Sequence, residues 1–232
     1  MTVKLIAALL VTWCVLVSAF LVNATMGVWV DPMNPVLRPL PQLLLVISLL
    51  VWFVLRPAAR PARRFALIFG LTLFALGDVA LAMTDQQPAG ILLYFCGFLA
   101  YGVWAARGLS TDHWRWLLIV PIVGVALLMT YWLWPVYGLL REAVVLYAGL
   151  LGLVTVLLII CPVLPWWAAA GPLSVAASQG LWAANEFLAG VPHATLSVMV
   201  AYYLGHLLLV LGVISLSAVE DAPAQVASLP AQ

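Results

Sequence analysis

Charge is scarce in this sequence. Asp, Glu, Lys and Arg together make up 7% of the 232 residues, whereas a soluble domain carries roughly 25%. Hydrophobic residues make up 66% of the chain, and the mean hydropathy is +1.18. An ordinary soluble fold cannot bury that much apolar surface, so the composition predicts an integral membrane protein. The net charge of +1 gives no reason to expect a nucleic acid as a partner.

Motifs for metals and common cofactors are also missing. The sequence contains no HExxH, no glycine-rich phosphate-binding loop and no GxSxG. The three cysteines, Cys14, Cys96 and Cys161, lie in or at the end of apolar runs without metal-ligand spacing, which is typical of small core residues. We therefore expect no metal and no cofactor, and an acid–base site built from carboxylates and polar side chains remains the possible chemistry.

The apolar residues form runs of about 20, which is the length of membrane-spanning helices rather than of alternating barrel strands. We predict an all-α bundle of eight transmembrane helices at residues 3–22, 39–55, 65–83, 89–106, 114–133, 137–160, 166–188 and 194–216. The first run is long for the apolar part of a signal peptide, so we expect it to be retained. Residues 1–216 then form a single transmembrane domain, and residues 217–232 a disordered polar tail.

The distribution of Lys and Arg predicts the orientation in the membrane, because cytoplasmic loops are enriched in these residues. With the N-terminus inside, the inner side receives seven of the nine: Lys4, Arg56, Arg60, Arg63, Arg64, Arg107 and Arg115. Arg38 and Arg141 fall on the outer side. Both termini are therefore predicted to be cytoplasmic, in a multi-pass protein of the cell (inner) membrane.

One carboxylate, Asp78, lies inside the apolar run 63–83. A charge at the bilayer centre costs about 3 kcal/mol or more, so an ionisable residue in a membrane helix is a functional-site hypothesis by default. The predicted orientation places Asp78 in the outer half of its helix, near the outer ends that carry Arg38 and Arg141. A structural ion pair with either arginine is the alternative.

Other polar side chains fall at the same outer level. Arg141 and Glu142 open the helix 137–160, as functional groups or as interfacial anchors. Gln179 and Glu186 share a face of the helix 166–188, two turns apart, while Asn185 points away from that face. The structural alternative for Gln179 and Asn185 is that they only tie helices together by hydrogen bonds. In the last helix, Tyr202 and His206 share a face. His206 lies near the bilayer middle, where the alternatives are a hydrogen-bonded packing residue and a direct chemical role.

The segment FALGDVAL at residues 74–81 resembles the Gly-Asp motif of the YhhN family of membrane proteins, which includes the lysoplasmalogenases. The resemblance spans about residues 39–215 and depends on the order of several short segments. Besides 74–81, these are the segments at residues 37–40, 95–101, 140–147, 185–187 and 202–208.

The resemblance implies hydrolysis of the vinyl ether bond of a lysophospholipid, giving a fatty aldehyde and a glycerophospho-alcohol. Asp78 is the candidate acid, since an apolar environment favours a protonated carboxyl group. The chain departs from the family at Ser178–Gln179, where Ser-Asp is expected. Two alternatives follow: either Glu142 or Glu186 supplies the second carboxylate, or this chain has lost the family's chemistry. Gln179 is kept among the candidate catalytic residues with Asp78, Glu142 and Glu186.

The expected partner is a lysophospholipid or similar amphiphile within the membrane lipid. Arg38 or Arg141 would hold its phosphate as a bidentate donor. The remaining candidate substrate-binding residues are Asn185, Tyr202 and His206. Two alternatives stay open: a non-catalytic protein that binds or transports a lipid or small amphiphile, and a bundle in which these groups are purely structural.

Overall fold

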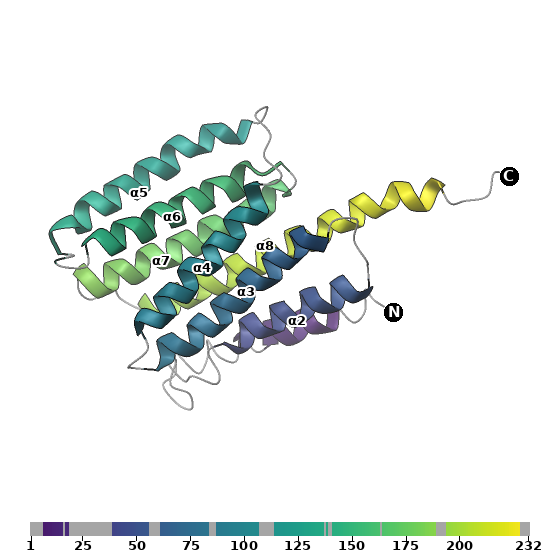
Figure 1. Cartoon of the computed structure of the whole chain (residues 1–232), viewed down its shortest axis with the longest axis horizontal. Coiled ribbons are helices and arrows are strands. Elements are labelled where there is room, and N and C mark those ends of the chain that lie inside the picture. The colour runs from purple at the N-terminus through teal and green to yellow at the C-terminus, as the bar shows by residue number, and fades with distance from the viewer. Residues whose placement is uncertain are drawn as a thin grey trace.

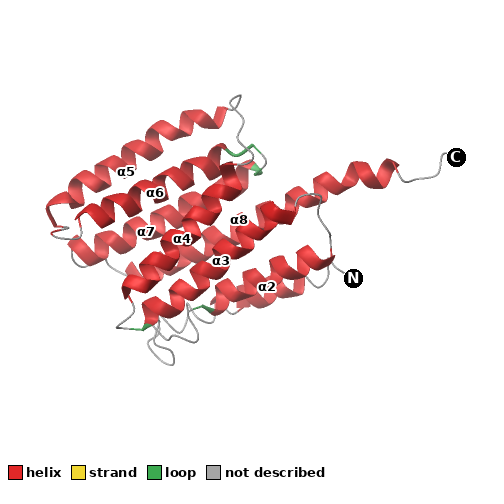
Figure 2. Cartoon of the chain, viewed as in Figure 1, coloured by secondary structure: helices red, strands yellow, loops and turns green. Residues whose placement is uncertain are grey.

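The computed structural model describes residues 7–15, 17–18, 39–55, 61–83, 87–106, 114–136, 138, 141–162, 164–188 and 194–227. Within these ranges the chain is helical without any strand, as Figure 2 shows. An N-terminal helix covers residues 7–15 and 17–18. It is followed by α2 (Leu40–Leu55), α3 (Pro61–Ala82), α4 (Gln87–Ala106), α5 (Ile119–Leu133), α6 (Arg141–Ile160), α7 (Ala170–Leu188) and α8 (Ala194–Ala227). Short 3₁₀ helices flank two of these: η1 (Trp114–Leu118) precedes α5 and η2 (Trp134–Val136) follows it, while η4 (Trp166–Ala169) precedes α7.

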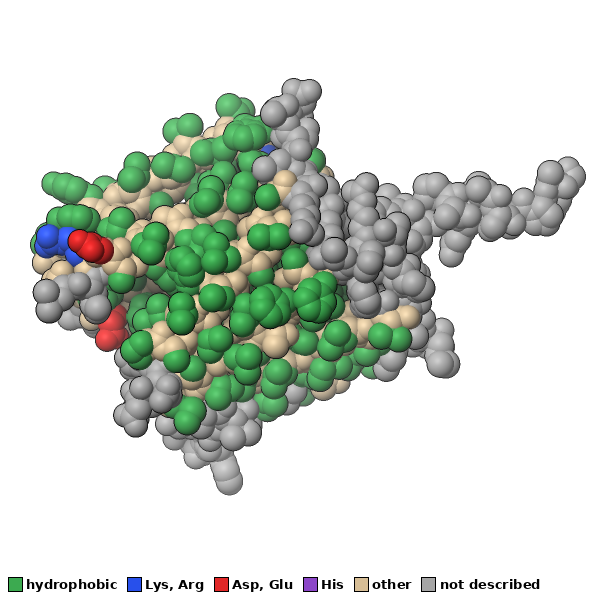
Figure 3. Space-filling model, viewed as in Figure 1, with side chains coloured by type: hydrophobic (Ala, Val, Ile, Leu, Met, Phe, Trp, Pro, Cys, Tyr) green, Lys and Arg blue, Asp and Glu red, His purple; other side chains and the backbone are tan. Residues whose placement is uncertain are grey.

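The all-α prediction is confirmed. Five of the described helices contain stretches long and apolar enough to cross a membrane: Phe65–Ala82, Pro88–Ala106, Arg115–Trp132, Arg141–Ile160 and Ala194–Ser215. Helix α2 adds a shorter apolar stretch, Leu40–Val51. Figure 3 shows the matching surface, with hydrophobic side chains covering the middle of the bundle and most of the visible charged ones at its left edge. Such a surface suits a lipid environment.

Several helix ends differ from the prediction for identifiable reasons. Helix α6 begins at Arg141 rather than at residue 137 because Gly138, with φ of +51°, interrupts the helical path. Helix α3 begins earlier than predicted, at Pro61, a residue favoured in the first helical turn. We expected the last helix to end at Leu216, before a disordered tail. It continues instead to Ala227 through an alanine-rich segment and projects past the bundle in Figure 1.

Six helices close a ring around the interior. Helix α2 packs on α3, α3 on α4, α4 on α6, α6 on α7, α7 on α8, and α8 back on α2. Helix α5 lies outside this ring against α6 and α7, and it forms one edge of the molecule in Figure 1. Large apolar side chains of α5 accordingly stay exposed, including Val120 and Leu127. The ring leaves an interior that side chains from α3, α4 and α8 fill.

Glycines fix the contact between the antiparallel helices α3 and α4. A Cβ atom added at any of four glycines would lie 2.4–3.0 Å from a large side chain of the facing helix. The pairs are Gly70 with Tyr101, Gly97 with Phe74, Gly77 with Tyr94, and Gly90 with Leu81. Each large side chain therefore lies over a glycine of its partner helix, a complementary small-to-large packing that brings the two backbones close together.

Candidate active site

Asp78 lies one turn before the end of α3 and is 1% exposed. Two phenols from different helices reach its carboxyl group. Tyr94 of α4 donates a hydrogen bond to Oδ1 at 2.5 Å, and Tyr202 of α8 donates one to Oδ2 at 3.4 Å. Because Gly77 is the glycine beneath the Tyr94 ring, the Gly-Asp pair provides both the carboxyl group and the space for its partner.

A shell of aromatic rings surrounds this carboxyl group on the side facing the bundle interior. Its centre is Phe74, one turn from Asp78 on α3, which is fully buried. Ring centroids 4.8–6.4 Å from that of Phe74 belong to Tyr94, Phe98, Tyr101, Tyr202 and His206. The Tyr94 and Tyr202 rings also stack on each other at 5.8 Å. These contacts restrict both phenols and hold their hydroxyl groups toward Asp78.

His206 lies one turn further along α8 than Tyr202 and is fully buried. Its Nδ1 atom is 2.9 Å from the backbone oxygen of Tyr202, and its ring meets the Tyr202 ring at 4.6 Å. The structure thus brings two of the predicted substrate-binding residues, Tyr202 and His206, to the region of Asp78.

Gln179, the position at which the sequence analysis expects an aspartate, has a different partner. Tyr147 of α6 donates a hydrogen bond to its Oε1 atom at 3.0 Å. The Tyr147 ring contacts Phe98 at 6.0 Å, and Phe98 in turn contacts Phe74. Gln179 is therefore connected to Phe74 through Tyr147 and Phe98, and an uncharged amide satisfies its hydrogen bond.

The other predicted polar residues that the structure describes lie at the same end of the bundle but outside the buried cluster. Glu142, in the first turn of α6, and Glu186, near the end of α7, are exposed, and Asn185 is half-buried. The guanidinium carbon of Arg141 lies 4.6 Å from the centroid of the Trp134 ring, a cation–π contact. Arg38 lies outside the described residues.

Several residues of the site were missed by the sequence analysis. Tyr94 and Tyr101 lie two turns apart on α4, and Phe74 lies one turn from Asp78, but tyrosine and phenylalanine are common in apolar helices and gave no distinct signal. Apart from these site residues, Gln42 of α2 was also missed, although an amide in an apolar helix is a distinct signal. It is fully buried, and neither atom of its amide has a hydrogen-bond partner in the described part of the chain.

The arrangement suits proton transfer at Asp78. A charged carboxylate would accept hydrogen bonds from both phenols, and a neutral carboxyl group would donate its proton to one phenol oxygen and accept from the other. Either protonation state therefore keeps hydrogen-bond partners. No three His, Cys, Asp or Glu side chains of the described ranges are grouped as a metal site requires.

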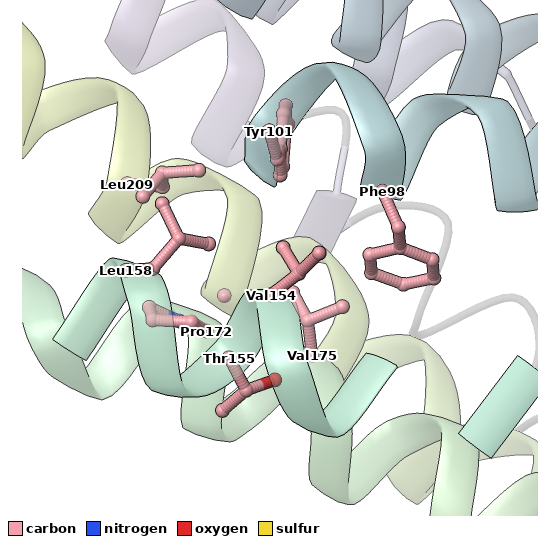
Figure 4. A pocket seen from close by; sticks show the side chains of 9 residues that line it. Phe98, Tyr101, Val154, Thr155, Leu158, Pro172, Val175 and Leu209 are labelled. Atoms are coloured by element: carbon pink, nitrogen blue, oxygen red, sulfur yellow. The ribbon is translucent and has the colours of Figure 1, made fainter. Parts of the chain in front are cut away.

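A small cavity adjoins the aromatic shell between α4, α6, α7 and α8. Its volume is about 10 Å³, which is room for about one water molecule. Figure 4 shows its lining, which is apolar except for Tyr101 and Thr155. A lipid chain does not fit in this cavity.

The YhhN family model matches residues 33–213, most of the chain. No curated protein matches the chain. No solved structure matches it either.

Proposed function

The chain belongs to the YhhN family, and on that premise we propose that it hydrolyses the vinyl ether bond of a lysophospholipid. The products would be a fatty aldehyde and a glycerophospho-alcohol. One observation carries the proposal: the carboxyl group of Asp78 is enclosed between the phenols of Tyr94 and Tyr202 inside an apolar bundle. A water-poor site of this kind holds a carboxylic acid in position to protonate an apolar substrate.

The reaction begins with transfer of the Asp78 proton to the β-carbon of the vinyl ether. This gives an oxocarbenium ion and a carboxylate, whose opposite charges are adjacent in an apolar site. Water then adds to the carbon attached to oxygen and loses a proton, which leaves a hemiacetal. The hemiacetal breaks down to aldehyde and alcohol, and the carboxyl group regains its proton, so that one water molecule is consumed in each turnover.

The substrate would lie with its alkenyl chain among the helices and its phosphate at the bundle end where α3 ends and α6 begins. Arg141, at the start of α6, is the described cation suited to a phosphate there. We also propose, from the bias of Lys and Arg along the sequence, eight membrane spans with both termini in the cytoplasm. This end of the bundle would then face the outside of the cell membrane.

Aldehyde release from a lysoplasmalogen by the purified full-length protein tests the proposal. We expect an Asp78→Asn variant to lose at least about 100-fold in turnover, the usual contribution of a general acid. Asp221→Asn, the same chemical change on the part of α8 beyond residue 216, is the control and should keep its activity. Full activity in a folded Asp78→Asn variant would refute the assignment of the acid.

Gln179 favours a second candidate, a protein that binds a lipid or small amphiphile without hydrolysing it. An amide cannot exchange a proton as aspartate does, and the alternative carboxylates Glu142 and Glu186 are exposed. A Gln179→Asp variant separates the two functions. Turnover gained by this variant in an inactive parent would indicate a binding protein derived from an enzyme. Turnover in the parent itself would exclude this second candidate.

A further inference from the structure

Two buried polar atoms belong to side chains of the aromatic shell. They are Nε2 of His206 and the hydroxyl oxygen of Tyr101, and neither has a hydrogen-bond partner among the described residues. His206 is 0% exposed and Tyr101 is 2% exposed. Their ring centroids are 5.9 Å apart, so both atoms belong to one region between α4 and α8. Buried polar groups without partners are rare, and each requires an explanation such as a bound ligand.

The hydrogen-bonding role of each atom follows from its surroundings. The backbone oxygen of Tyr202 can only accept a hydrogen bond, so the contact at 2.9 Å requires the proton of His206 to be on Nδ1. In the neutral imidazole, Nε2 is then an acceptor. The hydroxyl group of Tyr101 supplies a donor. One donor and one acceptor together match a molecule that can both accept and donate, as water does.

The cavity of about 10 Å³ adjoins these two residues, and its lining includes Tyr101 but not His206. Tyr101 lines it together with Thr155 and Gly205, the residue before His206. Thr155 lines the cavity as well, and Figure 4 shows its hydroxyl oxygen. This volume is sufficient for one water molecule, and an internal water usually makes two to four hydrogen bonds.

We propose that Tyr101 and His206 form a binding site for one water molecule and that, if the proposed function holds, this water is the one consumed in hydrolysis. His206 is close to the acid, because its ring meets the Tyr202 ring at 4.6 Å and the Tyr202 hydroxyl reaches Asp78 at 3.4 Å. The water oxygen adds to the oxocarbenium carbon, and its proton moves to Nε2. When the hemiacetal breaks down, its hydroxyl proton returns to Asp78, and the proton on Nε2 goes to the departing alcohol oxygen. Both side chains end in their starting states.

Stability measurements test the water site without relying on activity. The full-length protein is compared with Tyr101→Phe, with His206→Asn, and with the double variant, by thermal unfolding. His206→Asn keeps an amide donor near the position of Nδ1 and removes Nε2. Tyr131→Phe, which removes an exposed phenol on α5, is the control. Tyr101→Phe keeps the ring that packs over Gly70, so it alone remains informative if His206→Asn does not fold.

We expect Tyr101→Phe to lower the melting temperature by about 2 °C or more, and Tyr131→Phe to leave it unchanged. The two interior changes should couple, with the double variant losing less than the sum of the single losses, because either change removes the shared water. A Tyr101→Phe variant that is as stable as the parent or more stable would overturn the water site. Strictly additive losses would do the same.

Turnover separates this proposal from the proposed function. If the parent releases aldehyde, a folded His206→Asn variant should lose at least about 100-fold, as expected for removal of a general base. Full turnover in that variant would refute the role of His206 as the base that accepts the proton of water. The Asp78→Asn variant would still decide whether the proposed function holds. If the parent releases no aldehyde, the proposed function and the catalytic part of this inference fail together, and the stability cycle alone decides whether the water site exists.

Discussion

Replacing Gly77 with alanine should separate Tyr94 from Asp78. The added Cβ atom would lie 2.4 Å from Cδ1 and 2.5 Å from Cε1 of the Tyr94 ring. Ordinary contact begins near 3.4 Å, so the ring or its helix has to move by about 1 Å. The Tyr94 hydroxyl lies 2.5 Å from Oδ1, and a shift of that size in an aromatic shell that holds the ring on several sides weakens or breaks the bond.

The expected cost combines two effects. Overpacking typically costs about 1–3 kcal/mol, and a weakened hydrogen bond to a carboxyl group about 1–3 kcal/mol more. We therefore expect Gly77→Ala to lower the melting temperature by about 5 °C or more and to reduce aldehyde release as well. Tyr94→Phe, which keeps the ring and removes only the hydroxyl group, should reproduce the loss of activity with a smaller loss of stability.

A matched control is available on α6. A Cβ atom at Gly149 would meet nothing within 4 Å, so Gly149→Ala should be neutral or slightly stabilising, as alanine is the better helix former. If Gly77→Ala were as stable and as active as Gly149→Ala, the close approach of α3 and α4 would not be what positions Tyr94, and the reasoning would be refuted.

Three further changes test the packing of the bundle by thermal unfolding. Gln42→Leu should raise stability by about 1–3 kcal/mol, because it removes a buried amide without a protein partner among the described residues; a loss of stability would instead indicate a bound ligand. Arg115→Met should cost about 2–4 kcal/mol, because the guanidinium group donates to the backbone oxygens of Ile159 and Cys161 at 3.3 and 3.1 Å; an unchanged melting temperature would contradict this. Gly205→Ala should destabilise strongly, since its Cβ would lie 2.7 Å from the backbone oxygen of Gly171 on α7, and a stable variant would show that α7 and α8 can separate without cost.

Part of the site could be predicted from Asp78 alone. A carboxylate in an apolar run is unusual enough to be identified without any structure, because the membrane penalises it. Tyr202 and His206 were identified as polar residues on one helix face, and the structure places both in the aromatic shell. Tyr94 was missed, although it makes the shorter hydrogen bond to Asp78, because nothing in its own helix distinguishes it from a packing residue.

The predicted second carboxylate, Glu142 or Glu186, stays a prediction, and it shows what helix periodicity leaves open. Glu142 and Glu186 lie at the expected end of the bundle, but their helices turn them toward the exposed surface. Helix periodicity relates residues on one helix and leaves open which face of that helix meets its neighbours. The hydrogen bond between Gln179 and Tyr147 of α6 could not be predicted for the same reason, because it depends on which face of α7 meets α6.

The sequence by itself was enough to predict that this protein lies in a lipid bilayer, that it is helical, and which family it belongs to. Composition and run length are enough for the first two, because a bilayer accepts few structures besides apolar helices. Only the tertiary structure decided which groups meet Asp78. That choice depends on the closing of six helices into a ring and on the glycines that let α3 and α4 approach. The contacts join residues 16 and 124 positions apart in the chain, and no local pattern encodes such pairings.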